Sequence, residues 1–169
     1  MAHFDPFTAL WTAAATVTLG FFLKEISEWR LKRQKRRSVA GALAGEMGAY
    51  LYLMKPDQIA ENFTKIARLE KLIRTQRLKA LNELPDSHPV FDAIAKDIGE
   101  LPPKLAQEVS SFHNVVGGAR LMFLSIRKSE FHDADEAFQQ NFLITVPALM
   151  AEKLLEGKAT VEALIKLSG

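Results

Sequence analysis

Apolar residues recur at spacings of three and four along most of the chain, and this period predicts helices. The clearest pattern covers three heptads near the middle of the sequence. Its members are Leu105, Val109, Phe112, Val116, Ala119, Phe123 and Ile126. Because further helical segments follow in the same chain, we expect this seam to face the core of an antiparallel bundle. The sequence shows no strand-like alternation of useful length, so the predicted fold is all-α.

Prolines and turn residues divide this pattern into a bundle of about four helices. Pro56 should end a first helix, because the residue before a proline avoids helical geometry. An apolar stripe predicts a second helix over residues 56–84, and "LPDSHP" predicts a turn after it. Pro89 opens a short helix that closes near Gly99. A last helix over residues 138–167 follows the acidic stretch "SEFHDADEAF", and we expect Pro147 to kink or break it.

The first apolar run, "FTALWTAAATVTLGFFL" over residues 7–23, carries no charge and leads directly into Lys24. A membrane-spanning helix needs roughly 20 apolar residues, with about 17 as the lower limit. Four threonines dilute this run, although their hydroxyls can bond back to helical carbonyls. The sequence therefore predicts one N-terminal transmembrane helix, continuous with a long helix that reaches residue 54. A buried or interfacial helix and a signal-like segment are the alternatives.

Charge is distributed unevenly behind a formal net charge of +2. Residues 24–37 hold seven Lys/Arg and two Glu, a net charge of +5, whereas residues 38–169 hold 15 basic and 17 acidic side chains. Because Lys and Arg beside a span stay on the cytoplasmic side, we expect a single pass through the inner membrane with the N-terminus outside. The chain then divides into a transmembrane segment (1–23), a basic juxtamembrane flank (24–37) and a cytoplasmic helical bundle (38–169).

Two sets of residues are candidates for contacts of this N-terminal region. The flank would touch anionic lipid headgroups through basic side chains and one tryptophan, although the tryptophan could equally pack on the body. This set is Lys24, Trp29, Arg30, Lys32, Arg33, Lys35, Arg36 and Arg37. Small residues at every fourth position would let two spans approach closely and self-associate. That second set is Thr8, Thr12, Thr16 and Gly20.

A second basic run lies within residues 65–79 and has three interpretations. Its members are Lys65, Arg68, Lys71, Arg74, Arg77 and Lys79. A solvated helix face is the simplest interpretation, and contact with anionic lipid is the second. Nucleic-acid binding is the third, but it normally requires a basic domain with stacking aromatics or a recognition motif. The net charge of −2 over residues 38–169 argues against nucleic acid as a partner.

The sequence contains no catalytic, cofactor-binding or metal-binding motif that we can identify. The chain has no cysteine, and no two of its four histidines have the spacing of helical metal ligands. Scattered polar residues such as Glu46, His113 and His132 could still assemble a site in the folded chain. We therefore expect no cofactor and no metal, and the sequence favours a non-enzymatic role without deciding whether the protein is an enzyme.

Two stretches resemble segments of uncharacterised bacterial single-pass membrane proteins. They are "RLKRQKRRSVAGALAGEMGAYLYLM" and "HPVFDAIAKDIGELPPKLAQEVSSFHNVV". The residues that match the pattern of these proteins are Pro89, Phe91, Ala93, Leu101, Pro102, Pro103 and Leu105. The resemblance covers roughly residues 7–125, and its motifs are structural, so it implies a membrane-anchored helical protein and no particular activity.

From these patterns we expect a membrane-tethered helical interaction or scaffold module. Its partners would be a bilayer with anionic headgroups and either another protein or a second copy of itself. The alternative is an enzyme or effector that acts at the membrane surface, for which a phage- or defence-related role is one option. Its site would be assembled from scattered polar residues.

Overall fold

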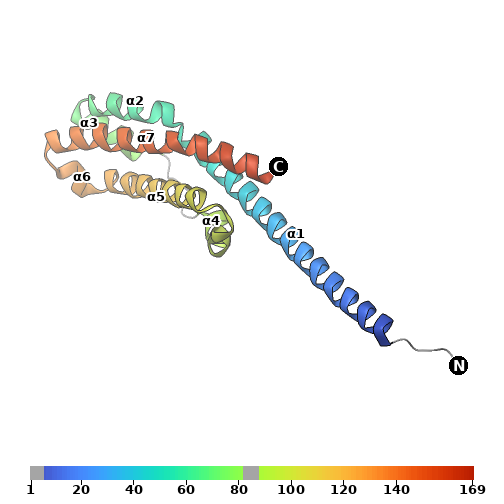
Figure 1. Cartoon of the computed structure of the whole chain (residues 1–169). Helices are drawn as coiled ribbons and strands as arrows, with labels where there is room; N and C mark the ends of the chain where they lie inside the picture. Colours follow the sequence, from blue (N-terminus) through green and yellow to red (C-terminus); the bar gives the residue numbers. More distant parts are fainter. Residues whose placement is uncertain (1–5, 82–87) are drawn as a thin grey trace.

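One long helix, α1 (Pro6–Met54), dominates the computed structural model and projects from a bundle formed by the rest of the chain (Figure 1). The structure describes the backbone of residues 6–81 and 88–169, and within these ranges the side chains from residue 18 onwards. At ~1.5 Å per residue, the 49 residues of α1 extend over roughly 74 Å. We call residues 18–37 of α1 the arm and residues 38–169 the body.

Seven shorter helical elements follow α1 in the described chain. They are α2 (Pro56–Ala67), α3 (Lys71–Lys79), α4 (Pro89–Ile94), the 3₁₀ helix η1 (Ala95–Glu100), α5 (Pro103–Ile126), α6 (Ser129–Asp133) and α7 (Glu136–Ser168). No strand occurs among the described residues, so the prediction of an all-α helical bundle is confirmed.

The core forms around α7, which packs against the body half of α1, against α2 and against α5. In Figure 1, α7 lies between α2 and α5, and its C-terminal end lies beside α1. The heptad seam predicted on α5 faces this core. Six of its seven residues are buried, and Phe123 is half-buried against the same cluster. From α1, fully buried Leu43 and Met47 enter the core.

The prediction of an N-terminal transmembrane helix is wrong. Over the part of the chain that the structure describes, no helix is long and apolar enough to cross a membrane. The side chains of residues 1–17, on which much of that prediction relied, lie outside the described ones. The uncharged run over residues 7–23 has 17 residues, four of them threonine, against the roughly 20 apolar residues that a span needs.

The predicted helix over residues 56–84 is interrupted. It ends as α2 at Ala67, and α3 begins at Lys71. The carbonyls of Ala67 and Leu69, which this break frees from helical bonds, accept from the Arg74 guanidinium at 3.2 and 3.1 Å. Arg74 is fully buried, so one member of the second basic run caps α2 and is not part of a solvated face.

The start of α7 agrees with the sequence prediction, but its continuation past Pro147 does not. Asp135 caps its N-terminus, with the carboxylate accepting from the backbone N–H groups of Ala137 and Phe138 at 2.9 and 3.2 Å. Pro147 was expected to kink or break the helix, but α7 runs through it to Ser168. Pro147 is buried, and packing of α7 against three other helices compensates for the one backbone hydrogen bond that proline removes.

Candidate functional site

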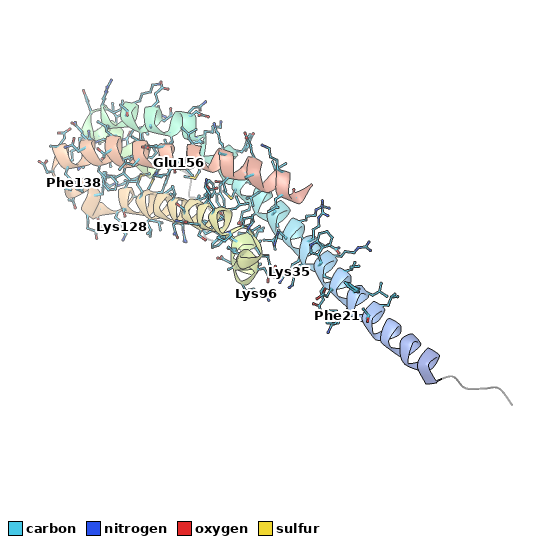
Figure 2. The ribbon with its side chains drawn as sticks, in the orientation of Figure 1. Phe21, Lys35, Lys96, Lys128, Phe138 and Glu156 are labelled. Atoms are coloured by element: carbon cyan, nitrogen blue, oxygen red, sulfur yellow. The ribbon has the colours of Figure 1, made fainter. Side chains whose placement is uncertain are left out.

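The arm carries all eight residues predicted to contact lipid headgroups. Seven of them are exposed, and Arg37, at the junction with the body, is half-buried. Apolar side chains on the arm are equally open to solvent. Their exposed fractions are 64% for Leu19, 59% for Phe22, 61% for Leu23, 48% for Ile26 and 59% for Trp29. Figure 2 shows Phe21 on a stretch of α1 that no other helix accompanies.

The contacts described for the outer part of the arm are local. Lys24 Nζ lies 3.9 Å from the Glu28 carboxylate, one helical turn away. The Arg33 guanidinium lies 5.4 Å from the centre of the Trp29 ring, again one turn away. Contacts of this kind stabilise an exposed helix weakly. The outer part of the arm is therefore helical with no tertiary contact described for it.

The base of the arm is fastened to η1 by two basic residues. Lys35 Nζ lies 2.8 Å from the Asp97 carboxylate and 3.5 Å from that of Glu100. The hydrogen bond to Asp97 raises the pKa of Lys35. Arg36 Nε donates to the backbone carbonyl of Glu100 at 2.7 Å. Two of the predicted lipid contacts thus also hold the arm at its angle to the body.

A groove of about 390 Å³ lies where the base of the arm passes the end of α7. One face of α1 lines it at positions i, i+3, i+4, i+7 and i+8. These residues are Trp29, Lys32, Arg33, Arg36 and Arg37. Lys166, Leu167 and Gly169 of α7 form the other wall. Among the described residues, no acidic side chain lines this groove, which we call the basic groove.

The residues predicted for self-association lie on the outer part of α1. The side chains of Thr8, Thr12 and Thr16 are outside the described ones. A Cβ placed on Gly20 would meet nothing within 4 Å. The space beside Gly20 is open in a single chain, and self-association through these residues stays a prediction.

The structure brings two of the three scattered polar candidates together. Glu46 of α1 is buried, and its carboxylate accepts from the backbone N–H groups of Val90 and Phe91 at 3.0 and 2.9 Å. His113 of α5 is also buried, with Nε2 at 3.7 Å from Glu46 Oε2. Its Nδ1 lies 3.2 Å from Nδ1 of His88, so one of these two nitrogens carries the shared proton.

The geometry of this cluster is that of a structural brace. Both carboxylate oxygens of Glu46 are occupied by the first turn of α4, which places a negative charge at a helix N-terminus. The His113 ring stacks on Phe91, with ring centroids 4.0 Å apart. Burial first, and then His88, lowers the pKa of His113 to about 4, so its imidazole is neutral at pH 7. The cluster ties α1, α4 and α5 together and leaves no basic nitrogen open to solvent at His113.

His132, the third candidate, lies elsewhere. It is a buried residue of α6, packed against Phe131 with ring centroids 5.8 Å apart. Burial lowers its pKa, and the charges of Lys79 and Lys71 act in the same direction. It shares no contact with Glu46 or His113, so these three residues do not form one site. Within the described ranges, no group of three or more His, Asp or Glu side chains is placed to hold a metal ion.

Three residues that sequence reasoning did not single out decide these arrangements. Lys166 completes the basic groove, His88 completes the Glu46 cluster, and Gln139 joins Arg74 in a buried network. The Gln139 amide donates to the carbonyls of His132 and Ala134 at 3.1 and 2.8 Å. All three depend on contacts between distant segments of the chain.

The chain matches no protein-family model, no functionally curated protein and no solved structure. The resemblance to bacterial single-pass membrane proteins therefore stays a prediction.

Proposed function

We propose that this protein is a helical interaction module that binds peripherally to an anionic membrane surface through its arm. The observation that carries the proposal is the arm itself, which holds exposed apolar residues and seven Lys/Arg and whose outer part is covered by no other described helix. The surface that fits is the cytoplasmic face of a membrane, whose leaflet carries anionic lipid.

Four apolar residues of the outer arm share one face. Leu19, Phe22, Leu23 and Ile26 follow the spacing i, i+3, i+4 and i+7. Arg30 and Arg33 continue that face, and Lys24 lies on the opposite side together with exposed Phe21. Bound peripherally, the outer arm would lie along the membrane surface with these apolar side chains among the lipid headgroups and its cations beside them.

Charge favours the same orientation. Each Lys or Arg near an anionic surface adds ~1 kcal/mol to binding. Trp29 follows the apolar face by one turn, at a position suited to an aromatic ring at headgroup level. The body would then stand away from the surface, available to a protein partner. A scaffold of this kind needs no catalytic residue.

Co-sedimentation of the full chain with vesicles tests the proposal. We expect binding to phosphatidylcholine vesicles that contain phosphatidylglycerol, and little binding to phosphatidylcholine alone. The variant Lys24→Ala/Arg30→Ala should bind about 30-fold more weakly, because two cations at ~1 kcal/mol each are lost. Neither residue lines the basic groove.

The matched control is Lys71→Ala/Lys79→Ala, which removes two exposed cations from the second basic run of the body. It should bind vesicles as the unaltered protein does. The proposal is wrong if the control loses binding while the arm variant keeps it, or if the unaltered protein binds both kinds of vesicle equally.

A further inference from the structure

We propose that the basic groove is a specific binding site for a phosphate group that carries at least two negative charges, either a phosphomonoester or a pyrophosphate. This inference builds on the proposed function, because the group could belong to a lipid headgroup or to a free phosphate compound. It goes further in assigning a discrete pocket, formed by both α1 and α7, where the arm alone would provide only a charged helix.

Convergence of cations from two helices is the first argument. Lys32, Arg33, Arg36 and Arg37 reach the groove from one face of α1, and Lys166 faces them from α7. Arginine forks bind phosphate oxygens in pairs, and lysine adds a point charge. A volume of about 390 Å³ lies within the range of small-ligand sites, ~300–1,000 Å³.

The second argument is that, among the described residues, no acidic side chain pairs with these cations. The ion pairs described for the arm use Lys24 and Lys35, which lie outside the groove lining. Arg36 donates through Nε to the Glu100 carbonyl, which leaves its terminal nitrogens without a described partner. By contrast, Lys158 on the same helix α7 is paired with an acidic side chain, the Asp57 carboxylate, at 2.9 Å.

The end of α7 accounts for only part of this positive charge. Carbonyls at a helix C-terminus act as roughly half a negative charge and attract nearby cations. Even if a carboxylate at Gly169 is added, the negative charge is about −1.5 against five cationic side chains. Satisfying the helix terminus would need one or two cations, so an excess remains for a ligand.

Trp29 gives the groove an apolar wall at its outer end. The ring is engaged by Arg33 at 5.4 Å, which holds that guanidinium beside the opening. Leu167 contributes a second apolar side chain from α7. A phosphate attached to an organic group would therefore find the charge inside the groove and an apolar surface at its edge.

Calorimetric titration of the full chain with inorganic pyrophosphate at low salt tests the inference. We expect saturable binding of one pyrophosphate per chain, which weakens as salt screens the charges. The variant Arg37→Ala/Lys166→Ala should bind at least 10-fold more weakly. Lys166→Glu alone should also lose binding, and because Lys166 is exposed this change should leave the fold intact.

The matched control is Lys128→Glu, which changes the net charge as Lys166→Glu does, at an exposed position at the opposite end of the body from the arm (Figure 2). Its pyrophosphate affinity should stay within 2-fold of the unaltered protein. Equal losses in the control and the groove variants would overturn the inference, since net charge alone would then explain binding. If Lys166→Glu lowers the melting temperature and leaves pyrophosphate binding unchanged, the inference is also overturned. The cations would then serve to stabilise the C-terminal end of α7.

Vesicles distinguish the two sources of the phosphate and separate this inference from the proposed function. Phosphatidic acid presents a phosphomonoester and phosphatidylglycerol a diester, so the two should be compared at equal surface charge. If the phosphate is a lipid headgroup, phosphatidic acid should bind more tightly, and Lys166→Glu should remove the difference.

Pyrophosphate binding without vesicle binding would keep the groove as a site for free phosphates and reject the arm proposal. Vesicle binding without pyrophosphate binding, unaffected by Lys166→Glu, would reject the groove and keep the arm.

Discussion

The two halves of α1 share one continuous helix and differ in almost everything else. Leu23 in the arm exposes 61% of its surface, whereas Leu43, twenty residues later, is fully buried. Helical geometry is the same in both halves, so backbone conformation does not distinguish their roles. What differs is the surroundings: the body half is stabilised by tertiary burial, and the arm depends on local contacts.

Cations show the same contrast. In the body, Arg74 is fully buried, and its guanidinium is bonded to two carbonyls and to Glu136 at 3.1 Å. In the arm and its groove, most cations face solvent without an acidic partner among the described residues. The body thus uses at least one buried charge to fix its fold, whereas most charges of the arm stay exposed.

Paired leucine substitutions in α1 should produce the largest difference between the two halves. Leu43→Ala should lower the free energy of unfolding by about 2–5 kcal/mol, because it removes a fully buried side chain and leaves a cavity. Leu23→Ala should change it by less than about 0.5 kcal/mol, because the site is exposed. Urea unfolding followed by circular dichroism measures both. Equal losses would show that the arm is packed against something in solution.

Acid should weaken the body through His113. Its pKa of about 4 in the folded chain lies below the ordinary value near 6.5, so the unfolded chain binds the proton more tightly. The associated stability is fully present above pH 6.5 and is lost as pH falls toward 4. Between about pH 7.5 and pH 4.5 the loss should be about 2–3 kcal/mol.

Urea unfolding of the unaltered protein and of His113→Gln at both pH values isolates this effect. The variant should lose correspondingly less stability on acidification, since glutamine does not titrate. An NMR titration of the His113 ring with a midpoint near 6.5 would contradict the prediction. His132 also has a lowered pKa, so it contributes to the total in both proteins and cancels in the comparison.

Glycine substitutions should separate a packed position from an open one. A Cβ on Gly157 would lie inside van der Waals contact with the Phe112 ring, so Gly157→Ala should destabilise the body by about 1–3 kcal/mol. Gly45→Ala is the control, because nothing lies within 4 Å of its added Cβ. It should stabilise α1 by up to about 1 kcal/mol through helix propensity. Melting temperatures that move in the same direction for both would refute the packing of Phe112 on α7.

Loss of the α7 cap should have the smallest effect of the four. Asp135→Ala removes the acceptor of two backbone N–H groups and should cost about 1 kcal/mol. Glu28→Ala in the arm removes only an exposed contact with Lys24 and should leave unfolding unchanged. Asp135→Asn, which keeps a side-chain acceptor, should recover most of the loss.

Patterns that depend on neighbours in the chain were predicted well. The seam on α5, the end of α1 before Pro56 and the acidic start of α7 follow from helical periodicity and from the geometry of proline and caps. The transmembrane prediction failed because it judged the N-terminal run against the lower length limit. The helix predicted over residues 56–84 failed because Arg74 satisfies the carbonyls that a break at Leu69 frees.

The sequence by itself determined that this protein is helical, where α1 ends and roughly where α7 begins and ends, and that the excess of positive charge lies in residues 24–37. Only the tertiary structure decided which part of α1 is packed, that Glu46 and His88 both meet His113, and that Lys166 lines one groove with the arginines of the arm. The physical reason is distance along the chain. Periodicity and capping act over a few residues, whereas these meetings join segments 25 to well over 100 residues apart, and no local pattern records them.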